Sequence, residues 1–162
     1  MPNDIVRRRA TRLPRGLAFA RLKKLTIRAA WQPRKGKRVG LTRGLTAVEH
    51  RVLDCLAQHA HTDPDGLCWP SLNTIAEYSG QQRRDRLGAP LRRLEKLRFY
   101  ETIQRGGGRR NPTLRRVLFH DLQPLDSETR DDVLKWWRIR RRDGASFRNR
   151  ETGSVTAAKG AA

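Results

Sequence analysis

A short run of glutamine and arginine side chains carries groups that hydrogen-bond to nucleic acids. The run comprises Gln81, Gln82, Arg83, Arg84 and Arg86. A guanidinium group can pair through two hydrogen bonds with guanine, and a carboxamide can do the same with adenine. Both groups also contact phosphates, which receive, with the sugars, most protein–DNA hydrogen bonds. We therefore expect the set to touch nucleic acid, with each arginine more often positioning the protein than reading a base.

Two further sets of basic side chains follow. The first continues the same segment and consists of Arg92, Arg93 and Lys96. The second set surrounds Gly106-Gly107-Gly108 and consists of Arg105, Arg109, Arg110, Arg115 and Arg116. A glycine-rich tip could approach a nucleic-acid backbone or enter a minor groove, so this set is interpreted as a basic wing. The alternative is an exposed hairpin whose glycines only close the turn.

The charge of the chain supports a polyanionic partner. The net charge is +20 over 162 residues. Residues 1–44 hold fourteen Lys and Arg against Asp4, a net charge of +13, whereas residues 45–80 carry −4 and residues 81–119 carry +9. Such a balance is typical of nucleic-acid binding and less often of binding to an anionic membrane surface. Because an acidic segment separates the two basic segments, the positive charge is not spread evenly along the chain, as it would be if it served only to keep the protein soluble.

Two helices with clear boundaries precede the arginine run. The sequence predicts a helix from Thr46 to His61, because Thr46 and Glu49 have the spacing of a capping box and apolar residues recur at helical spacing. A second helix is predicted to start after Ser71 and to stop at Gly80, a position that suits positive φ. Between them, Leu67-Cys68-Trp69 is predicted to be extended, because it precedes a proline.

The arginine run itself should open a third helix. This helix is predicted to start near Gln82 and to reach Leu97, with Leu87, Leu91 and Leu94 on one buried face and the basic residues opposite. Pro90 lies inside it, so a kink or a restart is expected, at a cost of about 3 kcal/mol within a helix interior.

The remaining elements follow the same pattern analysis. Residues 99–105 and 113–119 are predicted to form two strands around the glycine-rich loop. A last helix is predicted from Asp126 or Ser127 to about Arg142. It contains Trp136 and Trp137, which point about 100° apart on a helix, so one should be buried and the other partly exposed. The exposed ring is a candidate contact for a second copy of the chain or another partner.

Residues 45–119 resemble the winged helix-turn-helix domains of bacterial plasmid and phage replication proteins and related DNA-binding regulators. The resemblance is carried by Gly66-Leu67-Cys68-Trp69-Pro70-Ser71-Leu72, by Ile75-Ala76-Glu77 with Gly80, and by Leu91-Arg92-Arg93-Leu94-Glu95-Lys96-Leu97. It implies a mainly α fold with a small β-hairpin, the second helix of the motif entering a major groove. It also implies duplex DNA as the partner, in replication initiation or transcriptional regulation.

The expected organisation has three parts. Residues 1–44 are interpreted as a basic, flexible arm that orders on a polyanion, with a short amphipathic helix over 17–30 as the alternative. Residues 45–125 form the winged helix-turn-helix domain, and residues 126–162 a C-terminal helix with a loose tail. The sequence shows no secretory signal and no membrane-spanning run, so a reducing cytoplasm, in association with the nucleoid, is the expected location. A mitochondrial targeting segment is a further interpretation of the arm.

The sequence gives little evidence of a catalytic site, a cofactor or a metal site. No phosphate-binding loop, paired carboxylate site or nucleophile motif is visible, so the chain is predicted not to be an enzyme and to need no cofactor. Cys55, His59, His61 and Cys68 suggest zinc only weakly, because their spacings match no common zinc finger. Two alternatives to DNA binding remain: a structural RNA-binding component that uses the basic arm, and a protein-interaction module on a winged-helix scaffold.

Overall fold

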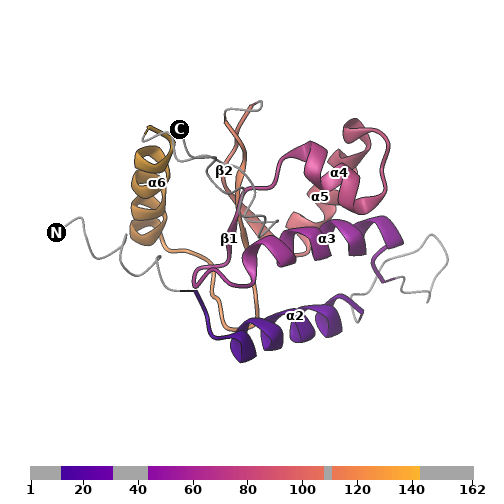
Figure 1. Ribbon diagram of the computed structural model, residues 1–162, viewed down its shortest axis with the longest axis horizontal. Helices are drawn as coiled ribbons and strands as arrows, with labels where there is room; N and C mark the ends of the chain where they lie inside the picture. The colour runs from indigo at the N-terminus through magenta and orange to yellow at the C-terminus, as the bar shows by residue number, and fades with distance from the viewer. Residues whose placement is uncertain (1–11, 31–43, 108–110, 143–162) are drawn as a thin grey trace, which may run out of the picture.

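The computed structural model describes residues 12–30, 44–107 and 111–142, which form a mainly helical fold with a small antiparallel sheet. The helices of this part of the chain are α2 (Arg15–Ala30), α3 (Ala47–Ala60), α4 (Leu72–Ser79), the 3-10 turn η1 (Arg84–Leu87), α5 (Gly88–Lys96) and α6 (Ser127–Arg142). The strands are β1 (Leu67–Cys68), β2 (Tyr100–Gln104) and β3 (Leu114–Val117). In Figure 1, α6 stands on one side of the β2–β3 hairpin, α4 and α5 lie on the other, and α3 and α2 run below them.

Helix α3 is confirmed with the predicted cap. The hydroxyl of Thr46 accepts a hydrogen bond from the Glu49 amide at 3.2 Å, and the Glu49 carboxylate accepts one from the Thr46 amide at 2.7 Å. Val52, Leu53 and Leu56 are buried on its inner face, as the apolar spacing predicts. The capping box therefore fixes the start of the helix on which the core is built.

The sheet has three strands in the order β1-β3-β2. β2 and β3 form the predicted hairpin, whereas the extended piece before Pro70 pairs with the other edge of β3 as β1. Gly66 leads into β1 with φ +70°, and a Cβ there would lie 2.7 Å from the carbonyl oxygen of Val117. Only glycine fits both the backbone angle and this close approach.

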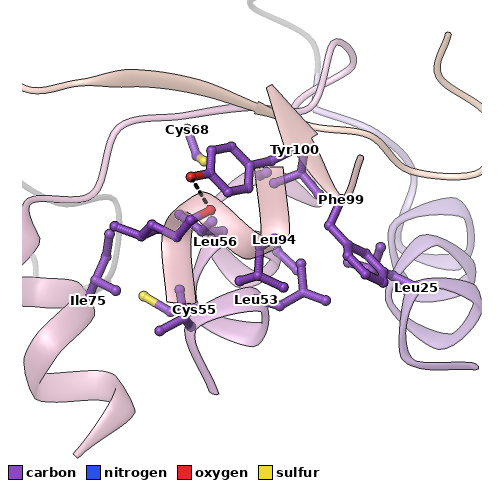
Figure 2. Close-up of a cluster of buried hydrophobic side chains, with 14 of the residues drawn as sticks. Leu25, Leu53, Cys55, Leu56, Cys68, Ile75, Leu94, Phe99 and Tyr100 are labelled. Carbon is purple, nitrogen blue, oxygen red and sulfur yellow. Dashed lines mark hydrogen bonds between the residues drawn. The ribbon is translucent and has the colours of Figure 1, made fainter. Parts of the chain in front are cut away.

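The main core connects α3 to the elements that carry the arginine run. Figure 2 shows this cluster, in which buried side chains come from α3, α4, α5 and the entry to β2: Leu53, Leu56, Ile75, Leu94 and Phe99. Full burial of one such side chain is worth about 1.5–3 kcal/mol. The cluster thus fixes the positions of α4 and α5 relative to the sheet.

Helix α2 differs from the expectation of a flexible arm. Ala18, Leu25 and Ala29 are buried, and Leu25 and Ala29 belong to the main core (Figure 2 shows Leu25 beside Phe99). The amphipathic helix that was the alternative is therefore present, because its apolar side chains find a core that the sequence pattern alone does not show. The rest of the predicted arm, residues 1–11 and 31–43, lies outside the described residues.

Two basic side chains of α2 are used inside the fold. Arg21 is 2% exposed, binds the carboxylate of Asp121 at 2.7 Å and donates to the carbonyl oxygen of Asp63 at 2.7 Å. Burial alone would raise the pKa of Asp121, but the hydrogen bond and charge of Arg21 lower it below its usual value. Arg28 donates to the carbonyl oxygen of Arg98 at 2.8 Å. The full +13 charge of residues 1–44 is therefore not free to meet a ligand.

Helix α6 matches its prediction at both ends. The amide of Thr129 donates to Asp126 at 2.7 Å, and this hydrogen bond lowers the pKa of Asp126. Trp137 is fully buried and Trp136 is half-buried, as the helical geometry requires. Their rings meet Trp69, with centroids 5.2 Å and 6.1 Å away respectively. The tryptophans thus attach α6 to the sheet, while a homodimer through α6 stays a prediction.

Candidate nucleic-acid interface

The segment that carries the predicted site begins at a well-defined turn. Ser71 caps α4 by accepting a hydrogen bond from the Thr74 amide at 3.0 Å, as predicted. Gly80 ends α4 with φ 70° in the left-handed region, also as predicted. The chain then turns through Gln81 and Gln82, which are half-buried and exposed respectively. This turn sets the angle between α4 and the arginine run.

The arginine run lies on a 3-10 turn rather than on the first turns of a helix. Arg83 is extended, and η1 covers Arg84–Leu87. Leu87 is completely buried and anchors the turn, whereas Arg84 and Arg86 are exposed. Arg83 and Asp85 form an exposed ion pair at 2.8 Å, which is worth at most about 1 kcal/mol and leaves Arg83 accessible.

Pro90 explains why the predicted third helix is divided. Helix α5 begins at Gly88, so Pro90 is its third residue. A proline in the first helical turn costs no hydrogen bond, because the amides there have no partner within the helix. Of the two expected outcomes, a kink and a restart, the structure shows the restart, with the arginine run before it. Tyr100 supports the new helix by donating to the carbonyl oxygen of Leu91 at 2.9 Å (Figure 2, dashed line).

The basic side chains of α5 divide into exposed and internal ones. Arg92 and Lys96 are exposed and four residues apart, so they share the outer face. Arg93 instead forms an ion pair with the buried carboxylate of Glu49. Burial raises the pKa of Glu49, but hydrogen bonds from Thr46 and Arg93 outweigh this effect and lower it overall. Of the three predicted side chains, α5 thus offers Arg92 and Lys96 to a ligand.

The hairpin differs most from the predicted wing. Arg115 and Arg116 are 5% and 4% exposed. Arg115 donates to the carbonyl oxygen of Pro70 at 3.4 Å, and Arg116 binds the carbonyl oxygen of Asp65 at 2.8 Å and the carboxylate of Glu101 at 3.2 Å. Both guanidinium groups therefore hold the sheet together and are almost completely buried.

Of the other predicted wing residues, only Arg105 can be placed. Arg105 is exposed where β2 leads into the loop. Arg109 and Arg110 lie outside the described residues. The loop itself closes at Gly106, where a Cβ would lie 2.0 Å from the carbonyl oxygen of Asn111, a distance that no side chain permits.

A groove joins this loop to the arginine run. Its volume is about 300 Å³, and its walls come from the N-terminus of α4, from η1 and from the hairpin loop. They include Ser71, Asn73, Arg84, Gly106, Asn111, Thr113 and the largely buried Arg115. The N-terminus of a helix carries a partial positive charge and unpaired amides, and Arg84 adds a full charge. The groove therefore favours an anionic group such as a phosphate.

The sequence did not identify three polar side chains of this groove. Ser71 was predicted only as a helix cap, and Asn73 and Thr113 were not singled out. Thr113 accepts a hydrogen bond from the Gly106 amide at 3.2 Å and so braces the loop. The cap pattern was the available signal, because a capped helix end that faces a glycine-rich loop is a common anion site.

The described residues contain no group of three or more His, Cys, Asp or Glu side chains that could hold a metal ion. Cys55 and Cys68 are buried thiols, and burial raises the pKa of Cys68 to about 12. None of the helices in the described ranges has both the length and the apolar character needed to cross a membrane. No family model, no curated protein and no solved structure matches this chain.

Proposed function

We propose that the chain binds duplex DNA through a winged helix-turn-helix unit. In this proposal α4 and the η1–α5 segment are the two helices of the motif, and the β2–β3 hairpin is the wing. The order α3, β1, α4, η1–α5, β2, β3 is the order that the resemblance implies. The exposed face of η1 and α5 would then enter a major groove, and the hairpin loop would contact the adjoining backbone.

The observation that carries this proposal is the distribution of the arginine side chains. The basic residues that point inward are bonded internally, as Arg93, Arg115 and Arg116 are. Those of η1 and the outer face of α5 are exposed, and Arg84 lines a groove bounded by a helix N-terminus. A scaffold used only for protein contacts would have no need to place the exposed guanidinium group of Arg84 at an anion-favouring groove, with further exposed arginines beside it on η1 and α5.

The biological setting is proposed from the resemblance. We place the protein in a bacterial, plasmid or phage system, in replication initiation or transcriptional regulation. A groove that binds phosphate would serve a protein in either of these two roles.

A binding competition tests the proposal. Labelled 30-base-pair duplex DNA should be displaced by unlabelled duplex at lower concentration than by an RNA hairpin of equal length. Replacing Arg84 with alanine should lower affinity for a selected site by about 1–3 kcal/mol, whereas Lys24→Ala, which removes one exposed charge from α2, should change it far less. A stronger displacement by RNA would favour an RNA-binding role instead. If the two substitutions lowered DNA affinity equally, the groove would not be part of the DNA-binding surface.

A site-selection experiment assigns the role of each arginine. If Arg84 or Arg86 reads a base, its alanine variant should relax sequence preference at one position of the selected site. If it contacts a phosphate, the sequence profile should stay the same, and the negative slope of log K against log salt should become shallower by about 0.9.

A further inference from the structure

The last turns of α6 carry a second group of basic side chains. Arg138, Arg140, Arg141 and Arg142 fall within five residues, while the acidic residues of α6 lie in its first turns. Favourable interaction with the helix dipole is limited to the last turn and is worth about 0.3–1 kcal/mol for an exposed charge. Arg138 and Arg142 are exposed, so this end of the helix presents positive charge to solvent.

The basic end of α6 lies on the same side of the molecule as the hairpin loop. Arg130 fixes α6 beside β2 by donating to the carbonyl oxygens of Thr102 and Ile103 at 3.1 Å and 3.2 Å. From there α6 rises by about 18 Å to Arg142, at about 1.5 Å per residue. In Figure 1 the C-terminal end of α6 and the ends of β2 and β3 that lead to the loop both lie on the upper side, opposite α2.

Arg140 connects this helix end to the wall of the groove. Its guanidinium carbon lies 5.0 Å from the ring centre of Trp69 and 5.6 Å from that of Trp136. Trp69 directly precedes Pro70, which lines the groove together with Ser71. The cation–π contacts hold α6 against the strand that leads into α4.

The same contacts decide what kind of ligand fits. Single-stranded nucleic acid is bound largely by stacking its bases on exposed aromatic rings. Here Trp137 is buried, and Arg140 lies over the half-buried rings of Trp69 and Trp136. Since Arg140 already lies over these two partly buried rings, the surface suits phosphates better than unpaired bases.

We infer that the basic end of α6 contacts the DNA backbone beside the stretch bound by the groove, so that one duplex meets two separate basic surfaces of the same chain. The inference rests on the proposed function. Arg138 and Arg142 supply the phosphate contacts, and Arg140 is a positioning residue that holds the helix end through Trp69 and Trp136.

A salt titration of the full chain tests this inference. The probe is a 30-base-pair duplex of mixed sequence, and the variant is Arg138→Gln with Arg142→Gln. The matched control is Lys23→Gln with Lys24→Gln, which removes two exposed charges from α2 on the opposite side of the molecule. Loss of two phosphate contacts should make the negative slope of log K against log salt shallower by about 1.8. Binding should weaken by up to about 60-fold at 0.1 M salt.

The control and two further measurements separate the outcomes. Thermal unfolding of both double variants should match the unsubstituted protein, because all four side chains are exposed. Equal slopes for the α6 variant and the α2 control would overturn the inference, as would a loss confined to an RNA hairpin of the same length. If Arg84→Ala lowers DNA affinity while the α6 variant does not, the inference fails and the proposed function stands. If neither change affects DNA binding, both fail.

Discussion

Replacing Arg93 with alanine should destabilise the fold and leave the exposed basic surface in place. Arg93 lies in the middle of the basic sequence run, but its guanidinium pairs with the carboxylate of Glu49, 44 residues earlier. The Glu49 side chain is 5% exposed and that of Arg93 is 23% exposed. The substitution would leave a buried carboxylate without the charge that faces it, while the hydrogen bond that it accepts from the Thr46 amide remains.

The expected loss follows from this geometry. Removing one partner of a buried ion pair typically costs about 3–5 kcal/mol. The cost here should be about 2 kcal/mol, because Arg93 is partly solvated and the cap hydrogen bond remains. At about 4 °C per kcal/mol for a domain of this size, the melting temperature should fall by about 8 °C. A double-mutant cycle with Glu49→Gln, which can still cap the helix, should show a coupling of about 1–2 kcal/mol.

The effect should depend on pH in a defined direction. The pKa of Glu49 is lowered in the folded state, so its ionised form stabilises the fold above the unfolded pKa of about 4.3. This stabilisation is lost as the pH falls through the lower, folded-state pKa. The difference in unfolding free energy between the original protein and Arg93→Ala should therefore be full at pH 7 and should shrink below about pH 4.

Arg92 provides the matched control for this prediction. It is the neighbouring residue on α5 but is exposed, so Arg92→Ala should change stability by no more than about 0.5 kcal/mol while weakening DNA binding. Calorimetry would give the melting temperatures, and fluorescence anisotropy at 25 °C the affinities. The reasoning would be refuted if Arg93→Ala unfolded at the original temperature and lowered DNA affinity as much as Arg92→Ala.

Three further changes test other parts of the structure. Trp137→Ala should lower the free energy of unfolding by about 3–5 kcal/mol in a denaturant titration, because the side chain is fully buried; a loss below 1 kcal/mol would contradict its place in the core. Deleting residues 1–44 should lower both general DNA affinity and the melting temperature, since it removes the buried side chains of α2; an unchanged melting temperature would contradict the packing of α2 against the core. Gly106→Ala should weaken duplex binding by distorting the loop, with little change in the free energy of unfolding of the main core. An unchanged affinity would show that the loop is not part of the DNA-binding surface.

The sequence alone determined the elements whose signals are local. The capping box of α3, the serine cap and glycine stop of α4, and the start of α6 at Asp126 or Ser127 were all predicted from residues within one helical turn of each other; α6 begins at Ser127. Each is stabilised by hydrogen bonds over three or four residues, so the pattern and its partner appear together in the chain. The buried and half-buried members of the Trp136–Trp137 pair followed from helical geometry for the same reason.

The division of the predicted third helix into η1 and α5 could be predicted only in part. Pro90 indicated that an uninterrupted helix was unfavourable, but a kink and a restart were both compatible with it. The buried position of Leu87 decides for a 3-10 turn followed by α5, because this arrangement keeps Leu87 and Leu91 in the core while proline falls in a first turn. The packing of neighbouring elements, absent from the local sequence, makes that choice.

Only the tertiary structure decided which basic residues face a ligand. Arg115 and Arg116 looked like wing residues, but β3 is the central strand, and both side chains bind groups supplied by the segments around β1. Arg21 is paired with Asp121, 100 residues away, and this contact helps to dock α2. A sequence shows how much positive charge a segment carries. Whether that charge meets solvent or an internal carbonyl or carboxylate depends on neighbours that only folding brings within hydrogen-bonding distance.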